Sequence, residues 1–326
     1  MTVPDPIEIA GETVHAGSRV ELELRPARLP SGGWMPIPVV AFHGAKPGPA
    51  IWVNAALHGD EVNGVEIIRQ VMADLDPKTM AGTVLAVPVV NVPGFATGDR
   101  YMPDRRDLNR SFPGSARGSL ASRFAHTFMS EIVKRCDYGI DLHTGSDHRH
   151  NTPQIRADLT DEATREIADV FAAPFALHAR LRDGSLREAA VRADARVLLY
   201  EAGESWRFDP EAIRVGVRGV RRVLHHLGIS MTPAKERRAR VAPTTVLARS
   251  SWLRSPMSGL ARISVELGSW VEAGAAVGVV SDATGSTERQ INARTAGHVI
   301  GRTESPVVHR GDALVHIAQA QEVDPA

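Results

Sequence analysis

The sequence is poor in cysteine, in net charge and in long apolar runs. Its one cysteine, Cys136, excludes an internal disulfide framework and suits a reducing compartment. Lys plus Arg and Asp plus Glu number 38 each, so no net field favours nucleic acid or anionic lipid as a partner. No apolar run reaches the roughly 18 residues of a membrane helix, and the first residues lack the features of a signal peptide. These absences predict a cytoplasmic protein with no nucleic-acid and no membrane partner.

Apolar segments of strand length alternate with segments of helical period, which is typical of an α/β fold. This alternation predicts a mostly parallel or mixed sheet with helices on both faces. Strands are expected at 19–25, 37–42, 51–57, 82–92, 138–143, 154–158, 175–179 and 196–200. Helices are expected at 60–75, 120–136, 161–171, 185–192 and 210–227.

The composition changes near residue 231 and divides the chain. Residues 231–243 begin with MTPAKERRARVA, a polar and basic stretch that reads as a linker. Beyond it, short alternating segments recur between glycine-containing turns, which predicts a small all-β domain. We therefore expect a first domain over 1–230, a linker over 231–243 and a β-rich domain over 244–326.

Two of the expected strands end at a histidine. The strand at 51–57 is followed by His58 and, three residues later, Glu61; the strand at 138–143 ends at His143. The carboxyl ends of parallel strands meet at one edge of a sheet, where α/β proteins bind ligands. Two imidazoles and one carboxylate are the protein ligands of a catalytic zinc, whereas a structural zinc usually uses cysteine. The competing interpretation, a surface histidine and a glutamate at a helix start, applies to an isolated H-x-x-E pattern.

A third strand end supplies a carboxylate. Glu201 follows the apolar run VLLY and precedes Ala202 and Gly203, so we expect it on the same edge as the two histidines. A carboxylate beside a metal-bound water can accept its proton and pass it to a leaving nitrogen. Glu204 is the competing candidate, and a purely surface role is the alternative for either glutamate.

Arginines gather in the segment at 99–114, DRYMPDRRDLNRSFPG, which shows no apolar periodicity. A guanidinium group binds a carboxylate through two parallel hydrogen bonds. Long irregular loops are common at active sites, so we expect Asn109 and Arg110 to bind an anionic substrate. A solvated basic loop is the alternative for any single arginine.

Four segments, ALHGDEVNG, DLNRSFPG, IDLHTG and LLYEAGE, resemble in this order the succinylglutamate desuccinylase/aspartoacylase family, a branch of the zinc carboxypeptidase-like superfamily. The resemblance implies one zinc ion per chain on His58, Glu61 and His143, and Glu201 as the base. It also implies that Asn109 and Arg110 bind the substrate carboxylate. Arg100 would polarise the scissile carbonyl, with Arg105, which is also expected to bind the substrate, in reserve. Tyr101 and Tyr200 are available as the family's substrate-binding tyrosine.

The C-terminal segments resemble a barrel-sandwich fold of the biotinyl/lipoyl type. That fold modifies a lysine, and no lysine follows Lys235, so a carrier role is excluded. The resemblance implies a domain that packs on the catalytic part and narrows its entrance. We expect structural or surface roles for its histidines, whereas His148 and His150 could line the pocket.

Taken together, the sequence predicts a zinc-dependent hydrolase that cleaves the amide bond of a small N-acylated amino acid or a related amine. A metallocarboxypeptidase acting on short peptides is the alternative within hydrolases, and a metal-free binding protein is the alternative outside them. The expected partner is a small anionic substrate. The acyl group, the amine and the oligomeric state, homo-oligomers included, are left open.

Overall fold

A mixed sheet of twelve strands forms the framework of the protein. The structure, a computed structural model, describes residues 3–230 and 243–320. The strand order is β13-β16-β18-β11-β9-β8-β10-β7-β5-β6-β4-β3. Four neighbours at its centre, β10, β7, β5 and β6, run parallel, whereas β8 and β4 flank them antiparallel. The predicted mixed α/β sheet is confirmed.

The strands of the α/β part are β1 (Ile7–Ile9), β2 (Glu12–Val14), β3 (Ser18–Arg28), β4 (Trp34–His43), β5 (Lys46–Ala55), β6 (Ala81–Val87), β7 (Tyr138–Gly145), β8 (Arg149–Ala157), β9 (Phe175–His178) and β10 (Arg196–Glu204). The helices are α1 (Asn63–Met72), α2 (Val92–Thr97), α3 (Leu120–Glu131), α4 (Glu162–Phe171), α5 (Leu186–Val191) and α6 (Pro210–His226). Short 3-10 turns lie at Leu108–Arg110 and Val133–Arg135.

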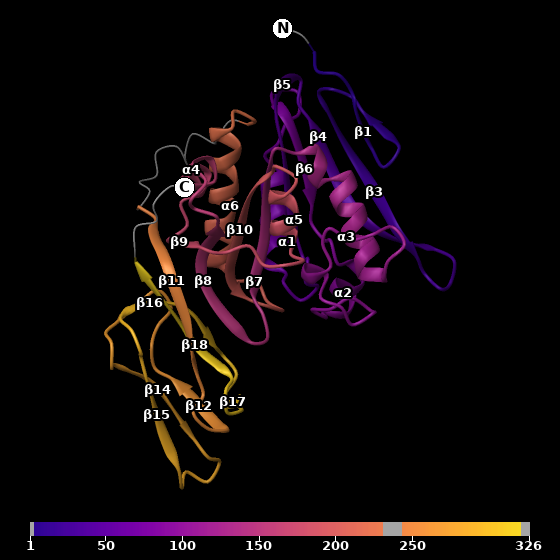
Figure 1. Ribbon diagram of the computed structural model, residues 1–326. Coiled ribbons are helices and arrows are strands. Elements are labelled where there is room, and N and C mark those ends of the chain that lie inside the picture. The colour runs from indigo at the N-terminus through magenta and orange to yellow at the C-terminus, as the bar shows by residue number, and fades with distance from the viewer. Residues whose placement is uncertain (1–2, 231–242, 321–326) are drawn as a thin grey trace.

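Helices cover both faces of the central strands, as the alternation in the sequence predicts (Figure 1). On one face, α1, α4 and α6 bury Ile67, Phe171 and Val220 in a core with Val53 and Ile140 of the sheet. On the other face, α3, α5 and the β1–β2 hairpin pack on residues of the opposite side of the same strands. The central strands are therefore buried on both sides, which explains their unbroken apolar runs.

Several expected elements differ from the structure. The helix expected at 120–136 ends at Glu131, and the strand expected at 154–158 begins at Arg149. The strand expected at 82–92 ends at Val87, because Asn91 caps a helix that begins at Val92 and accepts a hydrogen bond from Gly94 N at 3.0 Å. Pro93 lies in the first turn of this helix, where the missing N–H costs nothing. Helix α1 begins at Asn63 rather than Asp60, so His58 and Glu61 precede the helix.

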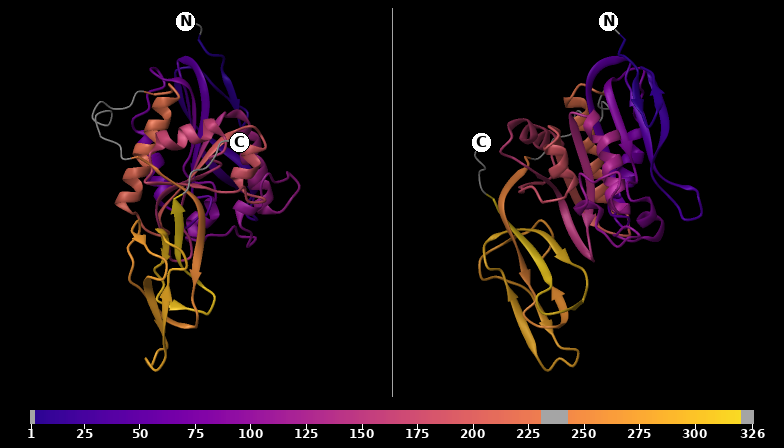
Figure 2. Two further views of the ribbon diagram at one scale, coloured as in Figure 1. Left: turned by 60° about the vertical axis from the view of Figure 1, so that its left-hand side comes forward. Right: turned by 45° about the vertical axis from the view of Figure 1, so that its right-hand side comes forward.

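The C-terminal strands extend the main sheet and add a second sheet. They are β11 (Thr245–Arg254), β12 (Gly259–Ile263), β13 (Trp270–Val271), β14 (Ala276–Ser281), β15 (Glu288–Asn292), β16 (Gly297–Thr303), β17 (Val307–Val308) and β18 (Ala313–Ala320). Strand β11 pairs in parallel with β9, and β16 pairs with β8, while β15, β14, β12 and β17 form a four-stranded sheet. Residues 243–320 contain no helix. Figures 1 and 2 show these strands as an elongated lobe at one end of the α/β part.

The expected linker at 231–243 lies almost entirely outside the described residues. The division into domains and the barrel-sandwich architecture of the C-terminal part stay predictions, and the shared sheet joins the two parts across the expected boundary. Within the described ranges, no helix is long and apolar enough to cross a membrane.

The packing of Trp52 against Gly139 gives a test of the core. The two residues are cross-strand partners on β5 and β7, and a Cβ at Gly139 would lie 2.0 Å from Trp52 Cζ2. We expect Gly139→Ala to lower the free energy of unfolding by about 1–3 kcal/mol, because Trp52 is fully buried and has no room to shift. Urea unfolding measures this difference.

Gly33→Ala is the matched control, since the nearest atom to its added Cβ is Leu29 Cδ1 at 3.8 Å. We expect this variant to stay within about 0.5 kcal/mol of the wild type. Equal effects of the two substitutions would contradict the packing described here.

Candidate metal centre and active site

Three of the predicted site residues lie at or just beyond the carboxyl ends of three adjacent parallel strands. His58 follows β5 by three residues, His143 lies near the end of β7, and Glu201 lies in β10. The register pairs Glu201 with His143, so their side chains leave the sheet on the same side. The structure therefore brings together these three residues from segments far apart in the chain.

His58 and Glu61 lie in a tight backbone turn that precedes helix α1, and not in the helix itself. Glu61 N donates to His58 O at 3.2 Å, which closes the turn before α1. The turn is packed against α2, where a Cβ on Gly59 would lie 2.0 Å from Gly94 C. Only glycine allows this close approach, so the HGDE segment is held tightly in place.

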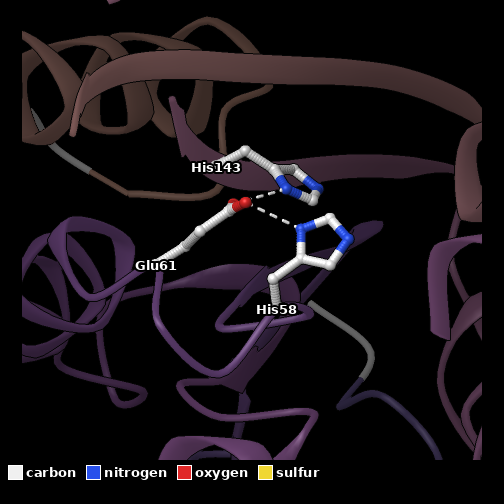
Figure 3. Close-up of side chains that lie close together, drawn as sticks. All are labelled: His58, Glu61 and His143. Atoms are coloured by element: carbon white, nitrogen blue, oxygen red, sulfur yellow. Dashed lines mark hydrogen bonds and ion pairs between the residues drawn. The ribbon is translucent and has the colours of Figure 1, made fainter. Parts of the chain in front are cut away.

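Glu61 lies between the two histidines (Figure 3). Its Oε1 is 2.8 Å from His58 Nδ1, and its Oε2 is 2.8 Å from His143 Nδ1. One ligand atom from each of the three residues lies within 4.8 Å of the others, and all three residues are buried. Thr144 N also donates to Glu61 Oε2 at 3.1 Å. This is the convergence that the sequence predicts.

The outer nitrogen of each histidine contacts a carboxylate. His58 Nε2 is 3.1 Å from Asp107 Oδ1, and His143 Nε2 is 2.9 Å from Asp141 Oδ2. Asp141 in turn accepts a hydrogen bond from Asn54 Nδ2 at 2.7 Å. Such carboxylate partners fix the ring orientation of histidines that bind metals.

The charges in the cluster shift the pKa values of its members. Burial raises the pKa of Glu61, but the imidazoles of His58 and His143 outweigh burial and hold it well below its usual value. Burial lowers the pKa of His143, yet Asp141 and Glu61 together raise it well above its usual value. The pKa of His58 is raised in the same way by Glu61 and Asp107 against burial.

The cluster fits a divalent metal ion by its chemistry. Two imidazoles and one carboxylate match the donor set of catalytic zinc sites, and the carboxylates on the outer nitrogens match their usual surroundings. Arg100 also reaches the cluster, with Nη1 donating to Glu61 Oε1 at 3.0 Å and Nη2 3.5 Å from Asp107 Oδ2. Arg100 therefore lies beside the candidate metal site and lines the cavity next to it.

The cluster opens into a cavity of about 300 Å³. Glu201 lines this cavity, as do Asn109 and Arg110. Glu201 accepts a hydrogen bond from Asn151, and its Oε1 is 3.6 Å from Arg156 Nη1. Asn109 Oδ1 accepts from Leu186 N at 2.9 Å, which leaves its amide nitrogen as the group that can donate to a ligand.

Several residues considered from the sequence lie outside the cavity. Arg105 is exposed at a turn with a φ of 60°, where its N–H donates to Met102 O, and it does not line the cavity. Tyr200 is buried in the core, where its hydroxyl donates to Ala212 O at 2.7 Å, and Tyr101 is exposed. Glu204 pairs with Arg207 at 2.7 Å instead of facing the cluster. His148 and His150 do not line the cavity either.

Other residues of the site are found only in the structure. Asp141 could have been found from the sequence, because it precedes His143 by two residues and so shares its face of the strand. No sequence signal distinguishes the remaining ones from surface residues. These further cavity residues are Arg149, Asn151, Arg156, Arg180, Arg182, Arg187 and Trp252.

Fold and site together define a member of a known enzyme class. Residues 47–227 match the model of the succinylglutamate desuccinylase/aspartoacylase catalytic domain, and the chain belongs to this family. It is 28% identical over 300 residues to the N-alpha-acetyl-L-2,4-diaminobutyric acid deacetylase of Halomonas elongata, covering 89% of this chain and 87% of the relative.

Two solved structures extend this similarity. The succinylglutamate desuccinylase/aspartoacylase from Rhodobacter sphaeroides superimposes with a TM-score of 0.84 at 27% identity, covering 93% of this chain and 96% of its own. The product-bound ectoine utilization protein EutE (DoeB) from Ruegeria pomeroyi gives a TM-score of 0.83 at 25% identity, with 92% and 95% covered. Both matches extend over the C-terminal strands as well as the α/β part.

The raised pKa values of the two histidines predict how metal binding depends on pH. A metal ion must displace the protons that these imidazoles retain above their usual pKa, so zinc affinity should rise with pH by about tenfold per unit for each proton displaced. Asp141→Asn removes the charge that raises the pKa of His143 most, so zinc affinity should stop rising at a lower pH in this variant. It should also weaken zinc binding at high pH by about 10- to 100-fold, because the ring loses its carboxylate partner.

Competition with a chromophoric chelator, repeated across the pH range, measures both effects. Asp5→Asn, which changes an exposed carboxylate far from the cluster in the sequence, is the control. Zinc affinity that is independent of pH in the wild type would contradict this description of the cluster.

Proposed function

We propose that this chain is a zinc-dependent hydrolase that removes the acyl group from a small N-acylated amino acid. The observation that supports this most is the convergence of His58, Glu61 and His143, with Glu201 on the neighbouring strand and facing the same cavity. A zinc ion on these three residues would lower the pKa of a bound water to about 7 and polarise a carbonyl group. The similarity to deacylases agrees with this reaction.

Glu201 is the proposed general base. It lines the cavity, and Asn151 and Arg156 hold its carboxylate in place. From this position it takes a proton from the attacking water and delivers it to the departing amine nitrogen.

Arg100, Asn109 and Arg110 are proposed to bind the substrate. Arg100 is held beside the cluster by Glu61 and Asp107, so its guanidinium group is oriented before the substrate arrives. It stabilises the negative charge that develops on the carbonyl oxygen. Asn109 and Arg110 lie on the 3-10 turn after Asp107 and donate to the substrate carboxylate.

The metallocarboxypeptidase alternative has no support of its own among the relatives, which are named as deacylases. We propose the cytoplasm as the location, because a single cysteine suits a reducing compartment.

Substitution of the base tests the assigned role. We expect Glu201→Gln to lower kcat by about 10²- to 10⁴-fold while zinc content stays that of the wild type, because the glutamine cannot accept a proton. Stopped assays of amine release and metal analysis measure the two quantities. Glu204→Gln is the matched comparison from the same strand, and a larger loss in that variant would assign the base to Glu204.

A substrate screen tests the reaction itself. We expect the zinc-loaded protein to hydrolyse at least one acetyl- or succinyl-amino acid. It should cleave dipeptides at least about tenfold more slowly, since the proposed activity depends on recognition of a simple acyl group such as acetyl or succinyl. Chelator should abolish the activity and added zinc restore it, and His58→Ala should contain no zinc. Preferential cleavage of dipeptides would favour the carboxypeptidase alternative, and failure to bind zinc supplied in excess would favour the binding protein.

A further inference from the structure

A line of hydrogen bonds joins the core of the sheet to the candidate metal centre. Trp52 Nε1 donates to Asn54 Oδ1 at 2.9 Å, and Asn54 Nδ2 donates to Asp141 Oδ1 at 2.7 Å. Asp141 Oδ2 lies 2.9 Å from His143 Nε2. Trp52, Asn54 and Asp141 are fully buried, and His143 is 5% exposed. The line therefore runs through the interior of the protein, where a hydrogen bond is electrostatically stronger than in water.

The pairing of β5 with β7 brings these side chains onto one face of the sheet. Trp52 is the register partner of Gly139, and Asn54 is the register partner of Asp141. Residues two apart in a strand share a face, so Trp52 and Asn54 project to the same side. The same rule places Asp141 and His143 on one side of β7. Gly139 has no side chain, which leaves the space that the indole ring of Trp52 fills.

The chemistry of the donors and acceptors fixes the direction of the line. An indole N–H can only donate, so Asn54 presents its oxygen to Trp52. The amide nitrogen of Asn54 then faces Asp141, whose carboxylate can only accept. Asp141 Oδ1 is held in this way, and its Oδ2 accepts from His143 Nε2. The other ring nitrogen, His143 Nδ1, consequently faces Glu61 Oε2 at 2.8 Å, on the side of the candidate metal site.

We propose that Trp52 and Asn54 are positioning residues of the candidate metal centre. They orient the carboxylate of Asp141, and Asp141 orients the ring of His143. Neither Trp52 nor Asn54 lines the active-site cavity, so they act on the site only through Asp141. Apolar side chains could fill the same space, but Asp141 Oδ1 would then lose its donor in a buried place, which is unfavourable. This inference rests on the proposed function, which names zinc as the metal ion.

The other histidine of the cluster is oriented by different elements. The carboxylate partner of His58 is Asp107, which lies just before the 3-10 turn and accepts from Asn109 N at 2.8 Å. Arg100 Nη2 lies 3.5 Å from the same carboxylate. A loop therefore orients His58, whereas strands inside the sheet orient His143. Substitutions at the start of the hydrogen-bonded line should weaken one ligand and leave the other in place.

Zinc affinity in two variants tests the inference. Trp52→Phe keeps an aromatic ring and removes the N–H, and Asn54→Leu keeps the side-chain volume and removes both polar atoms. We expect each variant to bind zinc about 3- to 10-fold more weakly, the range of one buried hydrogen bond. This loss is smaller than the roughly 10- to 100-fold loss expected when the carboxylate partner itself is removed. Competition with a chromophoric chelator measures the affinities.

A double-mutant cycle separates the hydrogen-bonded line from an effect of packing. If Trp52 acts only through Asn54, adding Trp52→Phe to Asn54→Leu should change zinc affinity by less than about twofold. Losses of zinc affinity that add in the double variant would overturn the proposed line, because each residue would then act independently of the other.

Thr83→Val is the matched control for the loss of a buried hydrogen bond in the same sheet. Thr83 lies in β6, and its Oγ1 is 2.9 Å from His43 Nδ1. We expect this variant to be destabilised toward urea, as the two test variants are, but to keep zinc affinity within about twofold of the wild type. A loss of zinc affinity in Thr83→Val equal to that in the test variants would overturn the inference.

The outcomes distinguish this inference from the proposed function. Deacylase activity together with unchanged zinc affinities in both test variants would overturn the positioning role and leave the function standing. If the protein binds zinc but hydrolyses no acylated amino acid, the zinc affinities decide the positioning role alone.

If the protein binds no zinc, NMR of the metal-free protein decides the positioning role. We expect the Nε2–H of His143 to give a slowly exchanging signal in the wild type and to exchange about tenfold faster or more in Asn54→Leu and Trp52→Phe, because the carboxylate that accepts it is less well held. The same exchange rate in all three proteins, or no such signal in the wild type, would overturn the inference.

Discussion

The site depends on the contacts that the buried carboxylate of Glu61 makes with its neighbours. It touches two imidazoles and the guanidinium group of Arg100, so its charge is compensated although it is buried. A buried carboxylate without such partners would be strongly destabilising. A charged, buried imidazole would be destabilising too if it lacked the carboxylate that contacts its outer nitrogen. The tight turn at Gly59 and the end of β7 hold these groups in place, and a divalent ion bound among them would displace protons from the imidazoles.

Parallel pairing explains why residues so distant in the chain meet. Strands β10, β7 and β5 are neighbours in the sheet and run in the same direction, so the residues at their carboxyl ends fall on one edge. For this reason His58, His143 and Glu201 could be predicted from the sequence as strand-end residues. The α/β class followed from apolar segments that are buried on both faces. The turn that holds His58 and Glu61 could not be predicted, since a three-residue spacing fits a turn and a helix equally.

Other parts of the site depend on tertiary placement that no local pattern encodes. Arg105 and Arg110 belong to one arginine-rich segment, yet Arg110 lines the cavity and Arg105 does not. Arg156 reaches Glu201 only because β8 pairs with β10. Trp252 reaches the same cavity because β11 joins the sheet beside β9, a pairing between segments about 70 residues apart that alternation alone does not specify. Sequence patterns therefore predict the strand-end residues of the cluster better than the residues that line the walls of the cavity.

The residues of the cavity come from two parts of the chain. The family match over 47–227 contains His58, Glu61, His143 and Glu201, whereas Trp252 in the cavity wall lies beyond it. The C-terminal strands are fixed to the α/β part by backbone pairing of β16 with β8 and by Glu304 N donating to His148 O at 2.7 Å. Trp252 therefore reaches the cavity from a strand that pairs with the sheet of the α/β part. Substitutions in β11 leave the strand-end residues of the cluster unchanged, so one fold and one cluster are compatible with different cavity walls among relatives.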